Sequence, residues 1–99
     1  MKHFIINIIY RAEMDEINRV LPQHRAFLRG GYERGLLLCS GPQNPRTGGI
    51  IVARAESLDA IQDFFQQDPY LLQGVAEHQF IEFEPVLRQS FLEDWVNGI

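Results

Sequence analysis

Two residues of this sequence carry side chains that together can move a proton. His24 lies three and four residues before Phe27 and Leu28, so helical spacing turns its imidazole inward with them. Asp68 directly precedes Pro69 in the stretch QQDPYLLQG. An imidazole has an ordinary pKa of about 6.5 and works as a general acid or base near neutral pH. We therefore hypothesise that Asp68 holds one ring nitrogen of His24 while the other nitrogen faces a substrate.

Each of these two residues also has a purely structural explanation. An inward histidine is more often a hydrogen-bonded part of the core, and Asp68 can act only as the N-cap of the short helical turn PYLLQG. Pro22 predicts that the main helix runs over residues 22–34, with 12–21 as a turn or short helix leading into it. His24 would then lie near the positive end of a helix, where an imidazolium is disfavoured unless a carboxylate is close.

The other candidates for metal or nucleophilic chemistry are weaker. His3 and His78 lie near the ends of predicted strands, and we expect both at the surface. Neighbouring residues on a strand face opposite ways, so Glu77 and His78 make a poor metal pair, and no Cys/His cluster has zinc spacing. The phosphate-loop and nucleophile-elbow motifs are absent. We expect neither a metal nor an organic cofactor.

The loop GPQNPRTGG, residues 41–49, offers groups that suit a small anion. Ser40 supplies a hydroxyl and Arg46 a cation, and the glycines at 41, 48 and 49 allow a ligand to approach the backbone closely. A plain long connection between two strands explains the same composition, and that alternative stays open.

Length, charge and cysteine content limit the class of protein. A chain of 99 residues predicts one domain, residues 1–99, with a core over 3–87 and a tail over 88–99. The net charge of −4, with scattered Lys and Arg, argues against nucleic acid as a partner. No apolar run approaches the roughly 20 residues that span a membrane. The single Cys39 and the absence of a signal-peptide pattern predict a cytoplasmic protein.

The pattern of apolar residues predicts the order β-α-β-β-α-β. This is the ferredoxin-like α+β unit, in which two helices cover one face of a four-stranded antiparallel sheet. The tail RQSFLEDWVNGI has apolar residues at helical spacing and predicts a terminal helix that docks. The predicted strands are 3–10, 36–40, 49–55 and 77–84, and the second helix covers 57–67, followed by a turn over 69–74.

The strands are apolar on both faces, which two helices on one side cannot cover. In the first strand, Phe4, Ile6 and Ile8 face one way while Ile5 and Ile9 face the other. The second face therefore predicts a homodimer through the sheets, with further association open. The alternative is that chance composition in a few short strands, or cover by the tail helix, accounts for the second apolar face. The other two strands alternate in the same way. In the predicted strand 36–40, Leu37 and Cys39 face one side of the sheet while Leu36 and Leu38 face the other. In the predicted strand 49–55, Ile50 and Val52 face one side while Ile51 and Ala53 face the other.

Several short stretches, taken in order, resemble a known family. They are His24 after a proline, a Gly-x-Leu-x-x-x-Gly-Pro run from Gly35 to Pro42, and Asp68-Pro69-Tyr70 followed by Gly74. In this order and spacing, roughly residues 3–87 resemble the YciI-like (YCII-related) family of the dimeric α+β barrel superfamily. The chain departs from that pattern in its long tail and in its short loop over 41–49.

The resemblance implies a ferredoxin-like fold, a homodimer formed by sheet faces, and an active site with a His and an Asp. Superfamily relatives include muconolactone isomerases and proteins of chloroaromatic breakdown. The implied chemistry is isomerisation, elimination or dehalogenation of a small organic acid or lactone. The matching residues are His24 and Asp68 as the catalytic pair, with Ser40, Gly41, Pro42, Arg46 and Tyr70 as expected substrate contacts.

The interpretation that follows is a cofactor-independent enzyme in which His24 and Asp68 transfer a proton. A non-catalytic dimeric module that binds a small ligand is the alternative, with the pair in a structural role. A cofactor-free monooxygenase of the same superfamily is a third, and it would need a deep aromatic-lined cavity. A His24–Asp68 pair that opens onto a pocket favours the enzyme, whereas a pair sealed in packing favours the module.

Overall fold

The chain alternates strands and helices in the predicted order, and the computed structural model describes residues 1–99. None of its helices has the length and apolar character needed to cross a membrane. The elements are β1 (Lys2–Tyr10), α1 (Met14–Glu33), β2 (Leu37–Pro42), β3 (Gly48–Ala55), α2 (Leu58–Phe65), α3 (Pro69–Leu72), β4 (Ala76–Phe83), a 3-10 turn (Ser90–Leu92) and α4 (Glu93–Val96).

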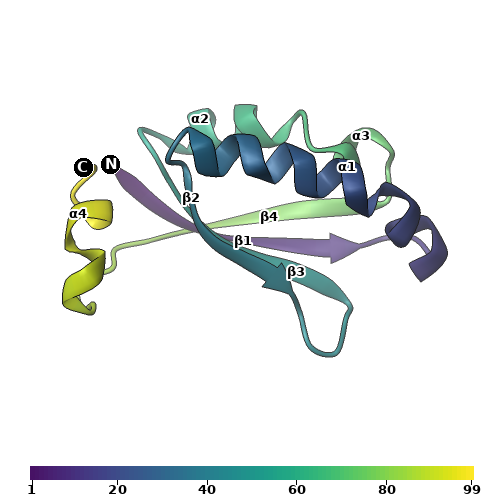
Figure 1. Cartoon of the computed structure of the whole chain (residues 1–99), viewed down its shortest axis with the longest axis horizontal. Coiled ribbons are helices and arrows are strands. Elements are labelled where there is room, and N and C mark those ends of the chain that lie inside the picture. The colour runs from purple at the N-terminus through teal and green to yellow at the C-terminus, as the bar shows by residue number, and fades with distance from the viewer.

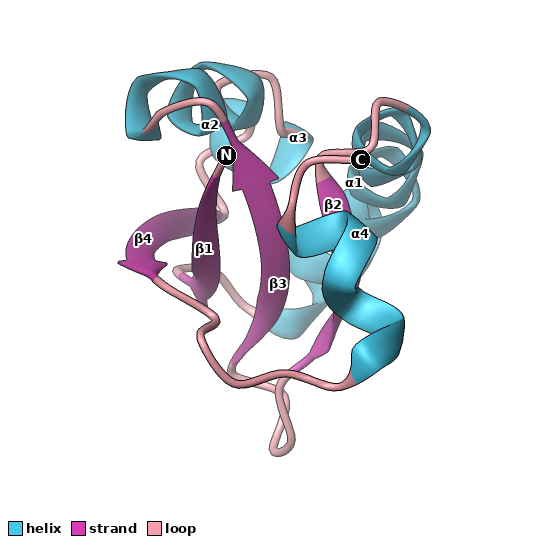
Figure 2. Cartoon of the chain, turned by 90° about the vertical axis from the view of Figure 1, so that its left-hand side faces the viewer, coloured by secondary structure: helices cyan, strands magenta, loops and turns pink.

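The four strands form one antiparallel sheet in the order β2-β3-β1-β4. Helices α1, α2 and α3 lie over one face of this sheet, while α4 lies beyond its end, near the N-terminus (Figure 1). The view in Figure 2 looks along the sheet from that end, with α4 in front. The predicted ferredoxin-like α+β fold is confirmed.

Helix α1 runs without a break from Met14 to Glu33, so the predicted start at Pro22 is wrong. A proline inside a helix removes one hydrogen bond and costs about 3 kcal/mol. The turns before the proline, however, bury Ile17 and Val20 almost completely, and each such side chain contributes roughly 1.5–3 kcal/mol. Packing of these turns on the sheet therefore outweighs the local cost of the proline.

The hydrophobic core lies between the helices and one face of the sheet. Phe4, Ile6 and Ile8 of β1 point into it, as the alternation along this strand predicts. Helix α2 begins at its predicted cap, where the Ser57 hydroxyl accepts a hydrogen bond from the Ala60 N–H at 3.1 Å. The core therefore forms on the side of the sheet that carries the three helices.

The opposite face of the sheet is apolar and carries no helix along its length (Figure 1), although Trp95 of α4 packs on His3 at one end of it. Ile50, Ile81 and Phe83 are 37%, 44% and 37% exposed, and Ile5 and Ile9 are half-buried. We call these five residues, with their neighbours on that side, the open face.

Strand β2 contains a bulge between Leu37 and Cys39. A bulge inserts one extra residue into a strand, so that the side chains after it point to the opposite sides of the sheet from those expected in a regular strand. Ser40 is therefore opposite the buried Ile51 on the helix side, where its hydroxyl lies 2.7 Å from the Oη of Tyr32 in α1. The prediction that Leu37 and Cys39 share a face is wrong, because it assumed a regular strand.

The tail docks on the end of its own sheet. The helix predicted over 88–99 is a 3-10 turn followed by the four-residue α4. The ring of Trp95 lies 5.5 Å from that of His3, and the Arg54 guanidinium lies 5.2 Å over it. Arg54 Nη1 also donates to the Trp95 carbonyl at 2.6 Å. The surface position predicted for His3 is therefore wrong, because the tail covers it.

Candidate active site

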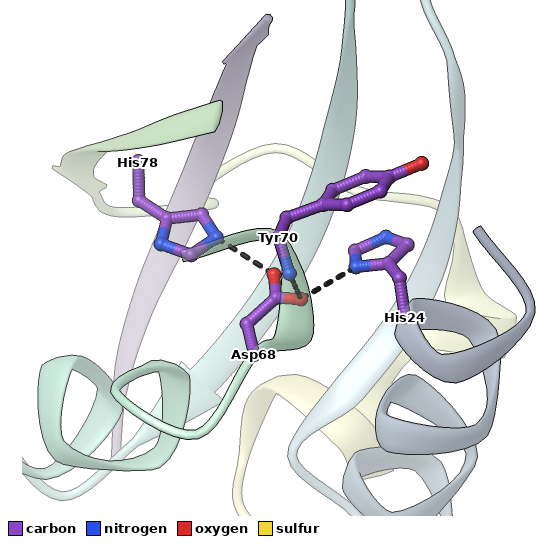
Figure 3. Close-up of polar contacts among 4 residues, drawn as sticks. All are labelled: His24, Asp68, Tyr70 and His78. Atoms are coloured by element: carbon purple, nitrogen blue, oxygen red, sulfur yellow. Dashed lines mark hydrogen bonds and ion pairs between the residues drawn. The ribbon is translucent and has the colours of Figure 1, made fainter. Parts of the chain in front are cut away.

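Asp68 lies at the junction of α2 and α3, where its carboxylate has three hydrogen-bond partners (Figure 3). The Oδ1 atom accepts from the Tyr70 backbone N–H at 3.0 Å, which caps α3, and lies 2.8 Å from Nδ1 of His24. The Oδ2 atom lies 2.8 Å from Nε2 of His78 in β4. Asp68 thus acts as a helix cap and as the partner of two imidazoles at once.

Burial removes the Asp68 carboxylate and the two imidazoles from water, which disfavours their charged forms unless they have partners. The Asp68 side chain is fully buried, and those of His24 and His78 are 7% and 4% exposed. Burial alone would raise the pKa of Asp68, but the hydrogen bonds from His24, His78 and the Tyr70 backbone outweigh it and hold that pKa below its ordinary value of 3.8. Asp68 is therefore an ionised acceptor at neutral pH.

His24 lies on the buried stripe of α1, together with Val20 and Leu28. Its inward orientation follows from helical spacing, but its predicted place near a positive helix end is wrong. Because α1 begins at Met14, His24 lies in the middle of the helix, away from the unpaired N–H groups of its first turn. The Asp68 carboxylate, and not the helix end, is therefore the main charge beside this imidazole.

Tyr70 fixes the plane of the His24 ring. The two rings stack with centroids 3.9 Å apart and planes 9° apart (Figure 3). With Nδ1 directed at Asp68 and one ring face covered by Tyr70, the imidazole has a single defined orientation. Its Nε2 points away from the carboxylate, and no hydrogen bond within the chain engages it.

A cleft of about 290 Å³ lies between α1 and the hairpin of β2 and β3. His24 lines it, whereas Asp68 lies behind His24 and does not reach it. The arrangement can therefore present one imidazole nitrogen to a small molecule while a buried carboxylate holds the other. The remaining predicted contacts, namely Ser40, Gly41, Pro42, Arg46 and Tyr70, all line the same cleft.

Comparison with known proteins identifies the relatives of this chain. The family model of the YCII-related domain matches residues 1–84. The chain belongs to the YCII-related family. Over 69 residues it is 38% identical to Protein YciI of Escherichia coli O6:H1 and to Protein YciI of Shigella flexneri, covering 60% of this chain and 70% of each relative.

A solved structure shares the fold of this YCII-related domain. It is 5-chloro-2-hydroxyhydroquinone dehydrochlorinase from Burkholderia phenoliruptrix AC1100, in complex with 2,5-dihydroxybenzoquinone. The TM-score is 0.66 at 21% sequence identity, over 82% of this chain and 90% of the dehydrochlorinase. At this level of identity the likeness concerns the fold.

Sequence reasoning missed three residues around the site of this YCII-related domain. His78 was predicted at the surface, yet it lies on the helix side of β4 opposite Ile8 and binds Asp68. Its position two residues before the half-buried Phe80 was the available signal, because alternate residues share a face. Tyr10 continues the inward alternation of β1 into the cleft, and Arg25 follows His24 along α1.

No group of three or more His, Cys, Asp or Glu side chains is arranged to hold a metal ion.

Proposed function

We propose that this protein is a small-molecule enzyme in which His24 and Asp68 form a general acid/base pair. The observation that carries the proposal is the His24 imidazole, whose Nδ1 lies 2.8 Å from a buried carboxylate while the residue lines an open cleft. The hydrogen bond to Asp68 selects the tautomer with its proton on Nδ1, which leaves the Nε2 lone pair free to accept a proton. A pair sealed in packing would favour the alternative of a non-catalytic module.

The proposed step begins with removal of a proton from carbon next to a carbonyl. The C–H bond breaks, an N–H bond forms at Nε2 of His24, and the electron pair moves onto the carbonyl oxygen as an enolate. Asp68 stabilises the resulting imidazolium across its Nδ1–H. Where a C=C bond is conjugated with the carbonyl, the electron pair reaches a second carbon, which takes the proton back from Nε2, and this is isomerisation. Alternatively the enolate expels a leaving group, which is elimination or dehalogenation, and Nε2 then releases its proton to solvent.

The substrate class that fits this cleft is a small organic acid or lactone. Ser40, Gly41, Pro42, Arg46 and Tyr70 line the cleft and would contact it, with Arg46 as a cation. A cleft of about 290 Å³ suits a molecule the size of one ring. A dehydrochlorinase of the same fold, in complex with 2,5-dihydroxybenzoquinone, supports elimination as one of the candidate reactions.

The test is exchange of solvent deuterium into candidate substrates, which detects proton removal whatever reaction follows it. Small carboxylic acids, lactones and 2,5-dihydroxybenzoquinone are first screened for thermal stabilisation of the protein, and NMR then follows exchange in those that bind. We expect His24→Gln to lower exchange roughly 10²–10⁴-fold, because it keeps a donor for Asp68 but removes the base.

The matched control is His3→Gln, the same change in a buried histidine outside the cleft, which should leave exchange unaltered. Equal exchange by wild type and His24→Gln would remove His24 from the catalytic role. Ligand binding by both proteins without exchange in either would favour the non-catalytic module.

We also propose that the protein is a homodimer through its open face. Each buried Ile or Phe contributes roughly 1.5–3 kcal/mol over its exposed state, and Ile50, Ile81 and Phe83 are all more than a third exposed. The identical face of a second copy is an apolar surface of the same size and shape. Ile81→Lys should shift the mass measured by analytical ultracentrifugation to that of a monomer, while Lys2→Ala, at the exposed start of β1, should not.

The cytoplasm is the proposed location. The lone Cys39 is free and exposed, which suits a reducing compartment.

A further inference from the structure

The phenol of Tyr70 is a buried hydroxyl that makes no well-formed hydrogen bond within the chain, although Tyr10 and Arg46 lie near it. Tyr70 is 2% exposed, and its Oη has no hydrogen-bond partner, yet the residue lines the cleft. Buried hydroxyls are nearly always paired, because leaving one unpaired costs stability. An unpaired donor at the wall of a cleft is explained if a ligand supplies the acceptor.

Two further polar side chains gather around this hydroxyl. The ring of Tyr10 meets that of Tyr70 edge-on at 6.0 Å, and the Arg46 guanidinium lies 5.9 Å over the Tyr10 ring. Arg46 reaches across the cleft from the hairpin and donates to Oδ1 of Asn18 in α1 at 2.9 Å. Burial and the nearby Tyr10 raise the pKa of Tyr70 to about 12, although Arg46 opposes them, so the hydroxyl keeps its proton at neutral pH.

The cleft is cationic in a chain whose net charge is −4. Its lining includes Arg25 and Arg46 and contains no Asp or Glu. Hydrogen bonds to an ionised acceptor are roughly twice as strong as those between neutral groups. A ligand that satisfies both the phenol and the arginines therefore carries an anionic oxygen.

We propose that Tyr70, Tyr10 and Arg46 form an anion subsite in which the Tyr70 hydroxyl donates to a carboxylate or phenolate oxygen of the ligand. This inference rests on the proposed use of the cleft as the substrate site. Because the Tyr70 ring is stacked on His24, the subsite and the base are held in one fixed relation. A carbonyl oxygen of the substrate placed there would receive the electron pair released when His24 removes a proton from the neighbouring carbon, so the Tyr70 hydroxyl would also stabilise the developing enolate.

The experiment compares anions with uncharged molecules of the same shape. The probes are benzoate with benzamide, and 4-nitrophenolate with 4-nitroanisole, titrated at mildly alkaline pH into the full-length protein and followed by NMR. The variants are Tyr70→Phe and Arg46→Gln. Arg34→Gln is the control, since it removes the same charge from a guanidinium that lies over Phe64, away from the cleft.

We expect the wild type to prefer at least one anion over its uncharged analogue, and the preferred anion identifies carboxylate or phenolate as the group recognised. Tyr70→Phe should weaken binding of that anion roughly tenfold or more. It should do so with an unchanged or higher melting temperature, since the hydroxyl has no partner to lose. Arg46→Gln should weaken the same anion, and Arg34→Gln should not.

Three results would overturn the subsite. The first is a wild type that binds neither anion or binds each anion no better than its uncharged analogue. The second is unchanged anion affinity in Tyr70→Phe. The third is a Tyr70→Phe protein that melts several degrees lower. The last would mean that the hydroxyl has a structural partner. Failure of the acid/base proposal is separate, because it appears as exchange by His24→Gln, whereas this binding test does not require the base.

Discussion

Two buried histidines lie near opposite ends of β1, and their electrostatic surroundings are opposite. His24, beside the end of β1, has an ionised carboxylate 2.8 Å away and an aromatic ring stacked on it. His3, at the start of β1, also packs on an aromatic ring, that of Trp95, but its charged neighbour is the Arg54 guanidinium. Burial lowers the pKa of His3 below 6.5, and although a backbone contact with Val96 opposes this, the charges of the N-terminus and Arg54 lower it further.

Burial and a proposed role in proton transfer are separate properties of these two histidines. Both imidazoles are removed from water, so burial alone does not distinguish a candidate base from a packing residue. The difference is a carboxylate beside the imidazole of His24 and a cleft that this residue lines. His3 has neither, and its Nε2 is buried without a partner. A guanidinium beside an imidazole favours the neutral ring, which suits packing of the tail.

The largest expected effect comes from removing the carboxylate at the His24 end. Asp68→Ala leaves three donors without an acceptor and removes the cap of α3. We expect a loss of about 3–5 kcal/mol in the free energy of unfolding by urea. Asp63→Ala, at an exposed position of α2, is the control and should change it by less than about 0.5 kcal/mol. A loss as small in Asp68→Ala would mean that the carboxylate does not organise this end.

His78 tests whether the second imidazole supports the carboxylate. His78→Phe leaves Oδ2 of Asp68 buried without a donor, and we expect it to cost about 1–3 kcal/mol in urea unfolding. His78→Gln keeps an N–H donor of similar reach, so it should recover at least half of that loss. Equal losses in the two variants would assign His78 a packing role only.

Trp95 tests the opposite end of the sheet. Trp95→Ala removes the ring that covers His3 and lies against Arg54, and it should cost about 1–2 kcal/mol. Ligand-induced thermal stabilisation should be unchanged, because the cleft is lined by other residues. The control is Phe91→Ala, since that side chain is 81% exposed. Loss of ligand response in Trp95→Ala would show that the two ends are coupled.

The pH dependence of stability gives the smallest expected effect and separates the two ends by their pH windows. The folded-state pKa of His3 is lowered, so its contribution is fully present above 6.5 and is lost as pH falls through the folded value, because the unfolded chain takes the proton first. The folded-state pKa of Asp68 is also lowered, so its contribution is present above 3.8 and lost below it. In urea unfolding, His3→Gln should flatten the profile below pH 6.5, and Asp68→Asn should flatten it below pH 3.8.

The fold follows from the sequence where local patterns and tertiary packing agree. Alternation in β1 and helical spacing around Ile61 and Phe65 are local signals, and both elements form where they predict. At Pro22 the local pattern and the tertiary packing disagree. The local pattern predicts a helix that starts at the proline, but burial of Ile17 and Val20 offsets the free-energy cost of a proline inside a longer helix. Such compensation depends on the sheet beneath the helix, which no window of sequence contains.

Some features of the candidate site can also be predicted from local sequence, and others depend on tertiary packing. The spacing of His24 and the Asp-Pro dipeptide at Asp68 are legible in the sequence, whereas their meeting requires α1 and α3 to lie side by side. His78 carries a signal in its alternation with Phe80, but its proximity to a strand end favours a surface position. The unpaired hydroxyl of Tyr70 has no sequence signature, because it is defined by what surrounds it.

The bulge in β2 has a practical consequence for studying this protein. Because the extra residue turns Ser40 toward α1, the neighbouring Cys39 pairs with Val52 on the open face, so the only thiol lies on the side of the sheet away from the cleft. A maleimide dye on Cys39 would therefore act as a built-in reporter of sheet-face association. Its labelling rate should fall as protein concentration rises.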